Sequence, residues 1–378
     1  MTKTVFAWTD ALLPVARRTI AGGDLPRVAV CALLVLLIGL AGCGDPSESQ
    51  STNGSGESQR AEPDLSVGVS SAAGLGDDLV VLTAAPDDLS KKLAFLRRSD
   101  GGWQELPDPP AGPSMLASAG DSIVMASIRC DSECLGNGRL EFSTLDADLS
   151  SWRPLKGPSV SVAADTEVAV GRSPQAFAWF EVGSVAYVVS GDGTVQQVPE
   201  SPYSDSETAF RCFTGDLAVL VPWRQVPVQG AGDATVRMTL HGVAIRLDPK
   251  DVRAGWQKLA SVPSGVETTY GDECVGDALT FHRDGKTVGL NVKTGEWAIG
   301  ESNYAALNGT SVFYSGAGRI AQSPSGNATI AVLSDGRLVR TTDNANWIDT
   351  GQKSSGVFST DSEVLSFRPD TNTFEVVS

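Results

Sequence analysis

Cysteine is the residue type with the most varied chemistry in this chain, because a thiol can be alkylated, oxidised to a disulfide or coordinated to a metal. Cys43 lies at a sharp change in composition. An uncharged apolar run, residues 28–42, ends at it, and a Ser-rich polar tract, residues 44–63, follows it. Arginines precede the run at positions 17, 18 and 27: Arg17, Arg18 and Arg27. The run is shorter than the roughly 20 apolar residues that span a bilayer, so we interpret it as the hydrophobic region of a secretory signal.

The four residues that end this segment, Leu40, Ala41, Gly42 and Cys43, resemble the lipobox of bacterial lipoproteins. The resemblance implies that the Cys43 thiol receives a diacylglyceryl lipid and that a peptidase cleaves after Gly42. Two acyl chains of the palmitate type anchor a protein stably where one is marginal, at ~0.8 kcal/mol for each buried methylene. We therefore expect a signal peptide over residues 1–42 and a lipid anchor on the extracytoplasmic side of the cell membrane. The alternative is an uncleaved signal anchor, and export by the general or the twin-arginine route stays open.

Residues 43–63 are expected to form a tether. The tract after Cys43 holds one apolar residue, Ala61, and cannot bury enough surface to offset the entropy of ordering. A flexible chain of this length reaches roughly 25 Å. It would hold a folded domain, residues 64–378, close to the membrane.

Four cysteines remain in that domain: Cys130, Cys134, Cys212 and Cys274. An even number outside the cytoplasm predicts two disulfides, with three possible connectivities. Cys130 and Cys134 would close a small loop. Cys212 and Cys274 each precede a tight turn, and we place them at equivalent positions of adjacent strands. We predict the pairs 130–134 and 212–274.

The sequence carries little that indicates catalysis. It lacks the serine-hydrolase, zinc-protease, phosphate-loop and EF-hand motifs. His241 and His282 are interpreted as ordinary strand residues, and no CxxC pair accompanies them, so neither a metal nor a cofactor is expected. Asp146 and Asp148 belong to a polar turn rather than to a glycosidase pair, whose members come from separate segments. We expect no catalytic residues.

The formal net charge is −16, and the domain has no basic run. A nucleic-acid surface needs clustered Lys and Arg, so nucleic acid is excluded as a partner. The charge is typical of a solvated surface, and we expect a monomer.

The elements that position these residues are short strands. Alternating or apolar runs recur after residue 64, and Gly-Asp, Asn-Gly and Asp-Gly turns separate them. One unit repeats: a strand, a polar turn and a short strand that opens with an anchor residue. The anchors are Trp103, Trp152, Val195, Trp256, Trp297, Trp347 and Phe374. A spacing of roughly 40–50 residues with strands alone predicts a β-propeller. We predict seven four-stranded blades, with six or eight blades, or two β-sandwiches, as alternatives.

Two of the units resemble known propeller motifs. Residues 247–259, LDPKDVRAGWQKL, are similar to the hairpin of kelch-type blades, and residues 341–347, TTDNANW, resemble an Asp-box with Ala345 at its central glycine. The resemblance implies architecture and no particular activity.

The last unit is too short for four strands. Residues 355–367 align with residues 114–126, the first two strands of the second blade. We predict that the final blade lacks its outer strand, and that residues 64–70 supply it and close the ring, because closure removes exposed sheet edges.

The connections between second and third strands are expected to be long and to share one face. We assign residues 128–138, 222–235 and 315–327 to them. Function concentrates on long loops of a rigid scaffold, so this face is predicted to bind a protein or glycan. Trp223 and Arg224 are the candidate anchors, and the alternative is that Trp223 packs its own loop. We expect a binding or scaffold module. The alternatives are a sialidase- or glycosidase-like enzyme and a subunit of an envelope assembly complex.

Overall fold

The computed structural model describes residues 62–377 apart from fifteen gaps: 131–136, 159, 164–165, 167, 171–175, 184, 204–207, 214–216, 228–235, 269, 276–277, 284–285, 302–319, 334 and 344. The described residues belong to one compact unit, Ser58–Ser378. Their regular elements are strands, apart from the 3-10 segment η2 (Pro249–Ala254). Cys43 and the lipobox residues Leu40, Ala41 and Gly42 lie outside the described residues, so the lipid anchor stays a prediction.

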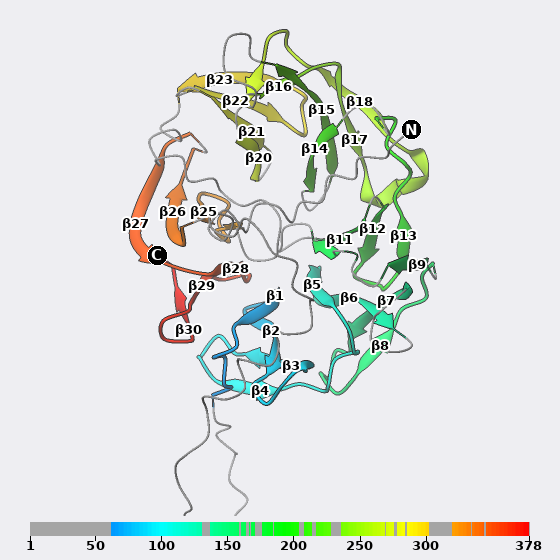
Figure 1. The fold of residues 1–378 in the computed structure, drawn as a ribbon, viewed down its shortest axis with the longest axis vertical. Coiled ribbons are helices and arrows are strands. Elements are labelled where there is room, and N and C mark those ends of the chain that lie inside the picture. The colour runs from blue at the N-terminus through cyan, green and yellow to red at the C-terminus, as the bar shows by residue number, and fades with distance from the viewer. Residues whose placement is uncertain are drawn as a thin grey trace, which may run out of the picture. The chain divides into compact units, whose positions relative to one another are not determined.

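Seven antiparallel sheets stand in a ring around a common axis (Figure 1), which confirms the predicted seven-bladed β-propeller. Blade 1 contains β1 (Val69–Leu75), β2 (Asp78–Ala85), β3 (Asp88–Arg97) and β4 (Trp103–Glu105). Blade 2 contains β5 (Ser114–Ala119), β6 (Ser122–Cys130), β7 (Asn137–Leu145), β8 (Trp152–Pro154) and the added β9 (Val160–Ala163). Blade 3 contains β10 (Val168–Val170), β11 (Phe177–Val182), β12 (Val185–Ser190) and β13 (Val195–Gln197).

Blade 4 is the largest sheet, with β14 (Thr208–Phe213), β15 (Ala218–Pro227), β16 (Val236–Leu240), β17 (Val243–Leu247), β18 (Gln257–Ser261) and β19 (Glu267–Thr268). Blade 5 contains β20 (Tyr270–Val275), β21 (Ala278–Arg283), β22 (Lys286–Asn291) and β23 (Trp297–Glu301). Blade 6 contains β24 (Ile320–Gln322), β25 (Thr329–Val332), β26 (Arg337–Thr341) and β27 (Trp347–Lys353). Blade 7 contains β28 (Gly356–Ser359), β29 (Val364–Arg368) and β30 (Thr373–Val376).

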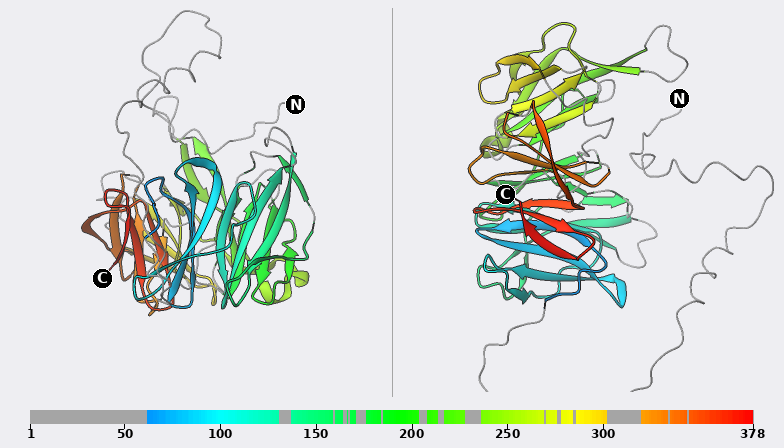
Figure 2. Two further views of the ribbon diagram at one scale, coloured as in Figure 1. Left: turned by 90° about the horizontal axis from the view of Figure 1, so that it is seen from below. Right: turned by 90° about the vertical axis from the view of Figure 1, so that its left-hand side faces the viewer.

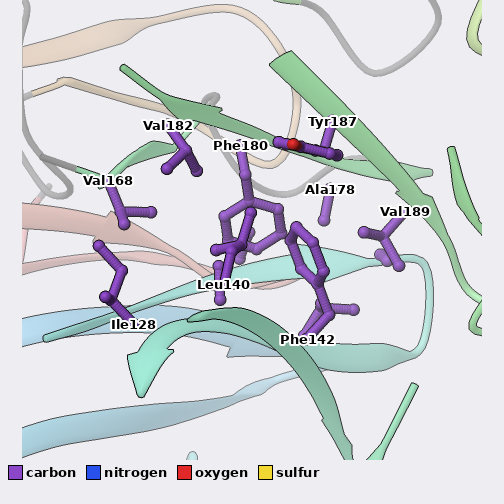
Figure 3. Packing of buried hydrophobic residues seen from close by; sticks show 13 residues of the cluster. Ile128, Leu140, Phe142, Val168, Ala178, Phe180, Val182, Tyr187 and Val189 are labelled. Carbon is purple, nitrogen blue, oxygen red and sulfur yellow. The ribbon is translucent and has the colours of Figure 1, made fainter. Parts of the chain in front are cut away.

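The hydrophobic core is divided into clusters between neighbouring blades. Between blades 2 and 3, for example, Phe142 of β7 packs against Phe180 of β11 and Tyr187 of β12, with ring centroids 5.6 and 5.4 Å apart (Figure 3). Burial raises the pKa of the Tyr187 phenol. Successive side chains of a strand point to opposite faces of the sheet. A strand in a blade that is covered on both faces therefore has a continuous apolar sequence.

Two of the recurring tryptophans join their blades to the connection that precedes them. Trp152 Nε1 donates a hydrogen bond to the Pro107 carbonyl at 3.0 Å, and Trp256 Nε1 donates to the Pro199 carbonyl at 2.9 Å. In both cases the acceptor lies on the connection that enters the blade. The anchor residues therefore have the predicted place at or next to the start of the outer strand, with one correction. Phe374 lies on β30, the third strand of blade 7, and is not equivalent to the tryptophans.

The ring closes between blades 7 and 1, where the prediction needs a correction. Blade 7 has three strands, as predicted, but residues 64–68 form a turn and β1 begins at Val69. The segment contributes Leu65, which is 1% exposed in a cluster with Phe358 and Phe374 of blade 7. Pro63 has no N–H, which disfavours a hydrogen-bonded outer strand at this place.

Backbone contacts and an ion pair complete the closure. The Asp361 N–H donates to the Gly76 carbonyl at 2.8 Å. The partly buried Arg97 of β3 lies 3.4 Å from the Glu363 carboxylate, Nη1 to Oε1. The seam is thus made by packing and polar contacts rather than by a shared strand.

Gly74 lies at the tightest point of this seam. A Cβ added there would lie 2.5 Å from the Ser359 carbonyl oxygen, because β1 and β28 run side by side. We expect Gly74→Ala to lower the free energy of unfolding by about 1–3 kcal/mol, since backbone must move to admit the methyl group. Urea denaturation measures this. Gly289→Ala on β22 is the matched control, because a Cβ there meets no atom within 4 Å. Equal effects of the two substitutions would contradict the expected clash.

Candidate binding face

Blades 2 and 4 extend beyond the others on the face that carries the turns between second and third strands. In blade 4, β15 pairs with β17 at Ala218–Leu220 and then continues, pairing with β16 from Trp223 to Pro227. This β15–β16 hairpin projects along the ring axis, past the neighbouring blades (Figure 2, right). In blade 2, the ends of β6 and β7 pair beyond the rest of the sheet, and β9 joins β7 at residues 137–140.

The extension of blade 4 also accounts for the longest distance along the chain between two successive anchors, from Val195 to Trp256. The step from Val195 to Trp256 includes β16, which the other blades lack. One predicted loop of this face is wrong, however. Residues 315–327 contain the inner strand β24, and the turn that follows it connects first and second strands on the opposite face.

The two candidate anchors lie on the β15–β16 hairpin but do not form one patch. Trp223 lies opposite Leu240 in the ladder, is half-buried and packs on the cluster between blades 4 and 5. Arg224 lies opposite Thr239 and is exposed. Neighbouring residues of a strand point to opposite sides of the sheet, so a partner that lies on one side of the hairpin meets only one of them.

Of the four domain cysteines, Cys130 ends β6 and is half-buried, while Cys134 lies outside the described residues. Cys212 and Cys274 belong to β14 and β20, inner strands that lie side by side. Their registers correct the expectation that they are equivalent. Cys274 pairs with the residue five positions later, Leu279, whereas in β14 it is Phe213 that pairs five positions ahead, with Ala218.

The residues that pair with the two cysteines bear on the predicted disulfide between Cys212 and Cys274. Cys212 lies opposite Val219 and Cys274 opposite Leu279, and both partner residues belong to the cluster between blades 4 and 5. The pairs 212–274 and 130–134 stay predictions.

The polar turn of the repeated unit has a structural role in blades 1 to 6. One Asp or Asn side chain in each turn between the third and fourth strands accepts a hydrogen bond from the N–H two residues later, at 2.8–3.1 Å. These residues are Asp100, Asp148, Asp192, Asp248, Asn291 and Asp343. Such Asx turns favour the tight reversal that brings the anchor residue into place.

Asp343, in the Asp-box-like turn, has the most perturbed carboxyl. Burial alone would raise its pKa, but hydrogen bonds from the N–H groups of Asn346 and Ala345, the Asn346 amide and the Thr341 hydroxyl lower it to about 2. The folded state therefore prefers the ionised form.

We expect Asp343→Ala to lower the free energy of unfolding by about 1 kcal/mol at neutral pH, after discounting for the exposure of the carboxylate. Because the folded pKa lies below the ordinary value of 3.8, the contribution is complete above about pH 4 and is lost as the pH falls towards 2. Urea denaturation at pH 7 and pH 3 measures it. Asp343→Asn keeps an acceptor without the charge, so its difference from Asp343→Ala should not depend on pH. A constant difference between the native chain and Asp343→Ala across this range would contradict the assignment.

The remaining chemical candidates are dispersed. His282 lies on β21, and His241 directly follows β16, where its N–H donates to the Pro222 carbonyl. The Tyr203 hydroxyl donates to the Val243 carbonyl. Asp146 accepts from Ser151 and Arg153, and Asp148 accepts from Ser150, so both acids belong to their own turn.

In the part of the chain that the structure describes, no group of three or more His, Cys, Asp or Glu residues could hold a metal ion. No helix among those residues is long and apolar enough to cross a membrane.

No family model matches this sequence, and no curated protein matches it. Among solved structures, puromycin hydrolase is similar over 82% of this chain and 53% of its own, at 14% identity and a TM-score of 0.48. The chain thus spans about half the length of that enzyme. Virginiamycin B lyase from Staphylococcus aureus is similar over 80% of this chain and 92% of its own, at 14% identity and a TM-score of 0.42. BamB from Moraxella catarrhalis is similar over 82% and 84%, at 14% identity and a TM-score of 0.38.

Proposed function

We propose that this chain is a membrane-anchored, extracytoplasmic lipoprotein whose propeller binds a protein partner on the face of the β6–β7 and β15–β16 hairpins. The observation that carries the proposal is the selective extension of this face. Blade 4 lengthens its second strand, β15, and pairs β16 with it, and blade 2 pairs the added β9 with the end of its third strand, β7. Rigid scaffolds present binding segments in this way.

The chemistry of the described residues also favours binding over catalysis. The described carboxyl groups with a lowered pKa accept hydrogen bonds within turns, as Asp148 and Asp192 do from Ser150 and Ser190. Catalytic groups, in contrast, converge on a cleft from separate segments. The predicted tether would give the propeller a reach of roughly 25 Å from the membrane.

A shortened hairpin tests the proposal. Arg224 and Thr239 are paired, so replacing residues 225–238 by Asn-Gly closes the hairpin with a two-residue turn. The shortened chain keeps β14, β17 and β18 and loses the pairing of Met238 with Thr268. Cells that produce the full-length chain are cross-linked, and the captured proteins are compared. We expect the shortened chain to lose a partner that the native chain captures.

Lys250→Ser, in the turn on the opposite face of blade 4, is the control and should keep that partner. Equal capture by the shortened chain would overturn the hairpin face as the site. Absence of any partner, together with glycan turnover by the purified chain, would replace the binding module by a carbohydrate-active enzyme.

A further inference from the structure

Blade 7 ends in β30, whose outer edge has no strand beside it in the described part of the chain. Its order is β28-β29-β30, and no strand within the described residues pairs with the outer side of β30. β28 lies near the centre of the ring and β30 at its periphery (Figure 1). The Val377 N–H donates to the Val364 carbonyl, so residues 373, 375 and 377 turn their backbone groups towards β29. The N–H and C=O groups of Phe374 and Val376 consequently point outward, as a template for a further strand.

The side chain of Val376, which lies beside this edge, is also exposed to solvent. The registers make Val80 of β2 equivalent to Leu365 of β29, because each follows a residue that pairs with the one five positions before it, Leu79 with Gly74 and Val364 with Ser359. Their partners on the third strands are Leu96 and Val376. Leu96 is 0% exposed, since β4 lies beside it with Gln104 opposite, whereas Val376 is 53% exposed. The difference is the absence of an outer strand at Val376.

Residues 62–68, the described residues that lead into β1, do not provide that strand. Glu62 and Asp64 are exposed, and neither belongs to a strand. Leu65 enters the cluster between blades 7 and 1, but no hydrogen bond joins its N–H to β30, whereas the N–H of Leu106, after β4, donates to the Ala94 carbonyl of β3.

We propose that the outer edge of β30 is a strand-addition site for an extended segment of a partner protein. Backbone hydrogen bonds to Phe374 and Val376 supply affinity, and the side chains that flank the edge supply selectivity. An apolar residue of the segment lies opposite Val376 and a basic residue opposite Glu375. Negative charge near this edge favours a basic segment. Glu375 and Asp370 share one guanidinium, that of Arg368, and the whole chain carries −16.

A second copy of this chain fits the edge less well. In the antiparallel register that uses both outward residues of each strand, Phe374 pairs with Val376 of the other copy. Glu375 then lies directly opposite Glu375 of that copy. Like charges in directly opposed positions destabilise a strand pair, so the edge favours a different chain with a basic residue at that position.

Two labelled heptapeptides test the site on the whole chain: one alternates valine and lysine, and the other alternates valine and glutamate. Fluorescence anisotropy measures binding, and amide hydrogen exchange measures protection of Phe374 and Val376. We expect the valine–lysine peptide to bind at least tenfold more tightly and to protect both amides.

Val376→Pro separates strand addition from general attraction of a cationic peptide. It removes an outward N–H that has no partner in the folded blade, so the unfolding transition should change little while binding weakens about tenfold. Val376→Ser keeps the backbone N–H and should weaken binding several-fold, because the apolar contact is lost. It provides a second test if the proline variant folds poorly.

Three results would overturn the proposal: equal binding of the two peptides, unchanged binding by both Val376 variants, or full protection of the Phe374 and Val376 amides without peptide, which would mean that the chain fills its own edge. None of these measurements involves the β6–β7 and β15–β16 hairpins, so the outcome is independent of the proposed binding face.

Discussion

Replacing Cys43 by serine is expected to abolish lipid attachment completely, which is the largest effect that the sequence predicts. A serine hydroxyl does not take the diacylglyceryl group that the lipobox resemblance assigns to the thiol of Cys43. Without two acyl chains the tether loses its membrane anchor, and a single chain would be marginal. Incorporation of labelled palmitate into the protein in growing cells measures the effect, with loss of the label as the expected outcome.

Cys31→Ser is the matched control, because Cys31 lies inside the apolar run and is predicted to be removed with the signal peptide. It should leave the label unchanged. Retention of the label by Cys43→Ser, or its loss in Cys31→Ser, would show that the attachment site has been assigned wrongly.

Replacing Cys212 by serine is expected to lower the free energy of unfolding by about 4 kcal/mol. The predicted bond to Cys274 closes a loop of roughly 60 residues, and cross-linking a loop of that size removes much of the entropy of the unfolded chain. The strands β14 and β20 lie side by side, and the residues paired with the two cysteines, Val219 and Leu279, belong to one cluster between the blades. Urea denaturation under oxidising conditions measures the loss.

Cys274→Ser should cost as much as Cys212→Ser, and the double variant should cost no more than either, because all three remove the same bond. A reducing agent should destabilise the native chain towards the level of these variants. Four reactive thiols in the denatured, unreduced domain would rule the disulfides out.

The local pattern of apolar runs, turns and anchor residues was sufficient to predict the seven-bladed architecture. Runs such as residues 79–83 and 123–128, bounded by Gly-Asp turns, predict strands because apolar residues on both faces of a short segment fit a sheet covered on both sides. The anchors at Trp103 and Trp152 mark blades because each begins an outer strand. The lack of an outer strand in the last blade was predicted from its short spacing and from the alignment of residues 355–367 with residues 114–126.

The features that could not be predicted depend on pairing between segments. The strand β24, at Ile320–Gln322, is short and flanked by Gly, Ser and Pro, so its sequence is typical of a loop, and only the pairing with β25 makes it a strand. Phe374 resembles the other anchors locally, yet the strand count of its blade places it one strand further in.

In the candidate site, too, the features that could not be predicted depend on how strands pair. The one-residue offset between Cys212 and Cys274 is a difference in strand register, which is set by the pairing of two strands and not by the local sequence of either cysteine. Adjacency in the sequence likewise suggested that Trp223 and Arg224 act together, although alternation along β15 separates them.

The closure between blades 7 and 1 has a consequence for the order of folding. Each blade is a set of hairpins and can form as soon as it has been synthesised, but Arg97 and Glu363 are separated by 266 positions in the chain. Contacts of such long range form late, because the entropy of loop closure must be met first. Leu65 and its neighbours on β2, Leu79 and Val81, therefore stay without their partners Phe358 and Phe374 until the last hairpin is available. A nascent chain carries this apolar surface for most of its synthesis, and a chain that stops short of blade 7 carries it permanently, as a surface that chaperones and proteases recognise.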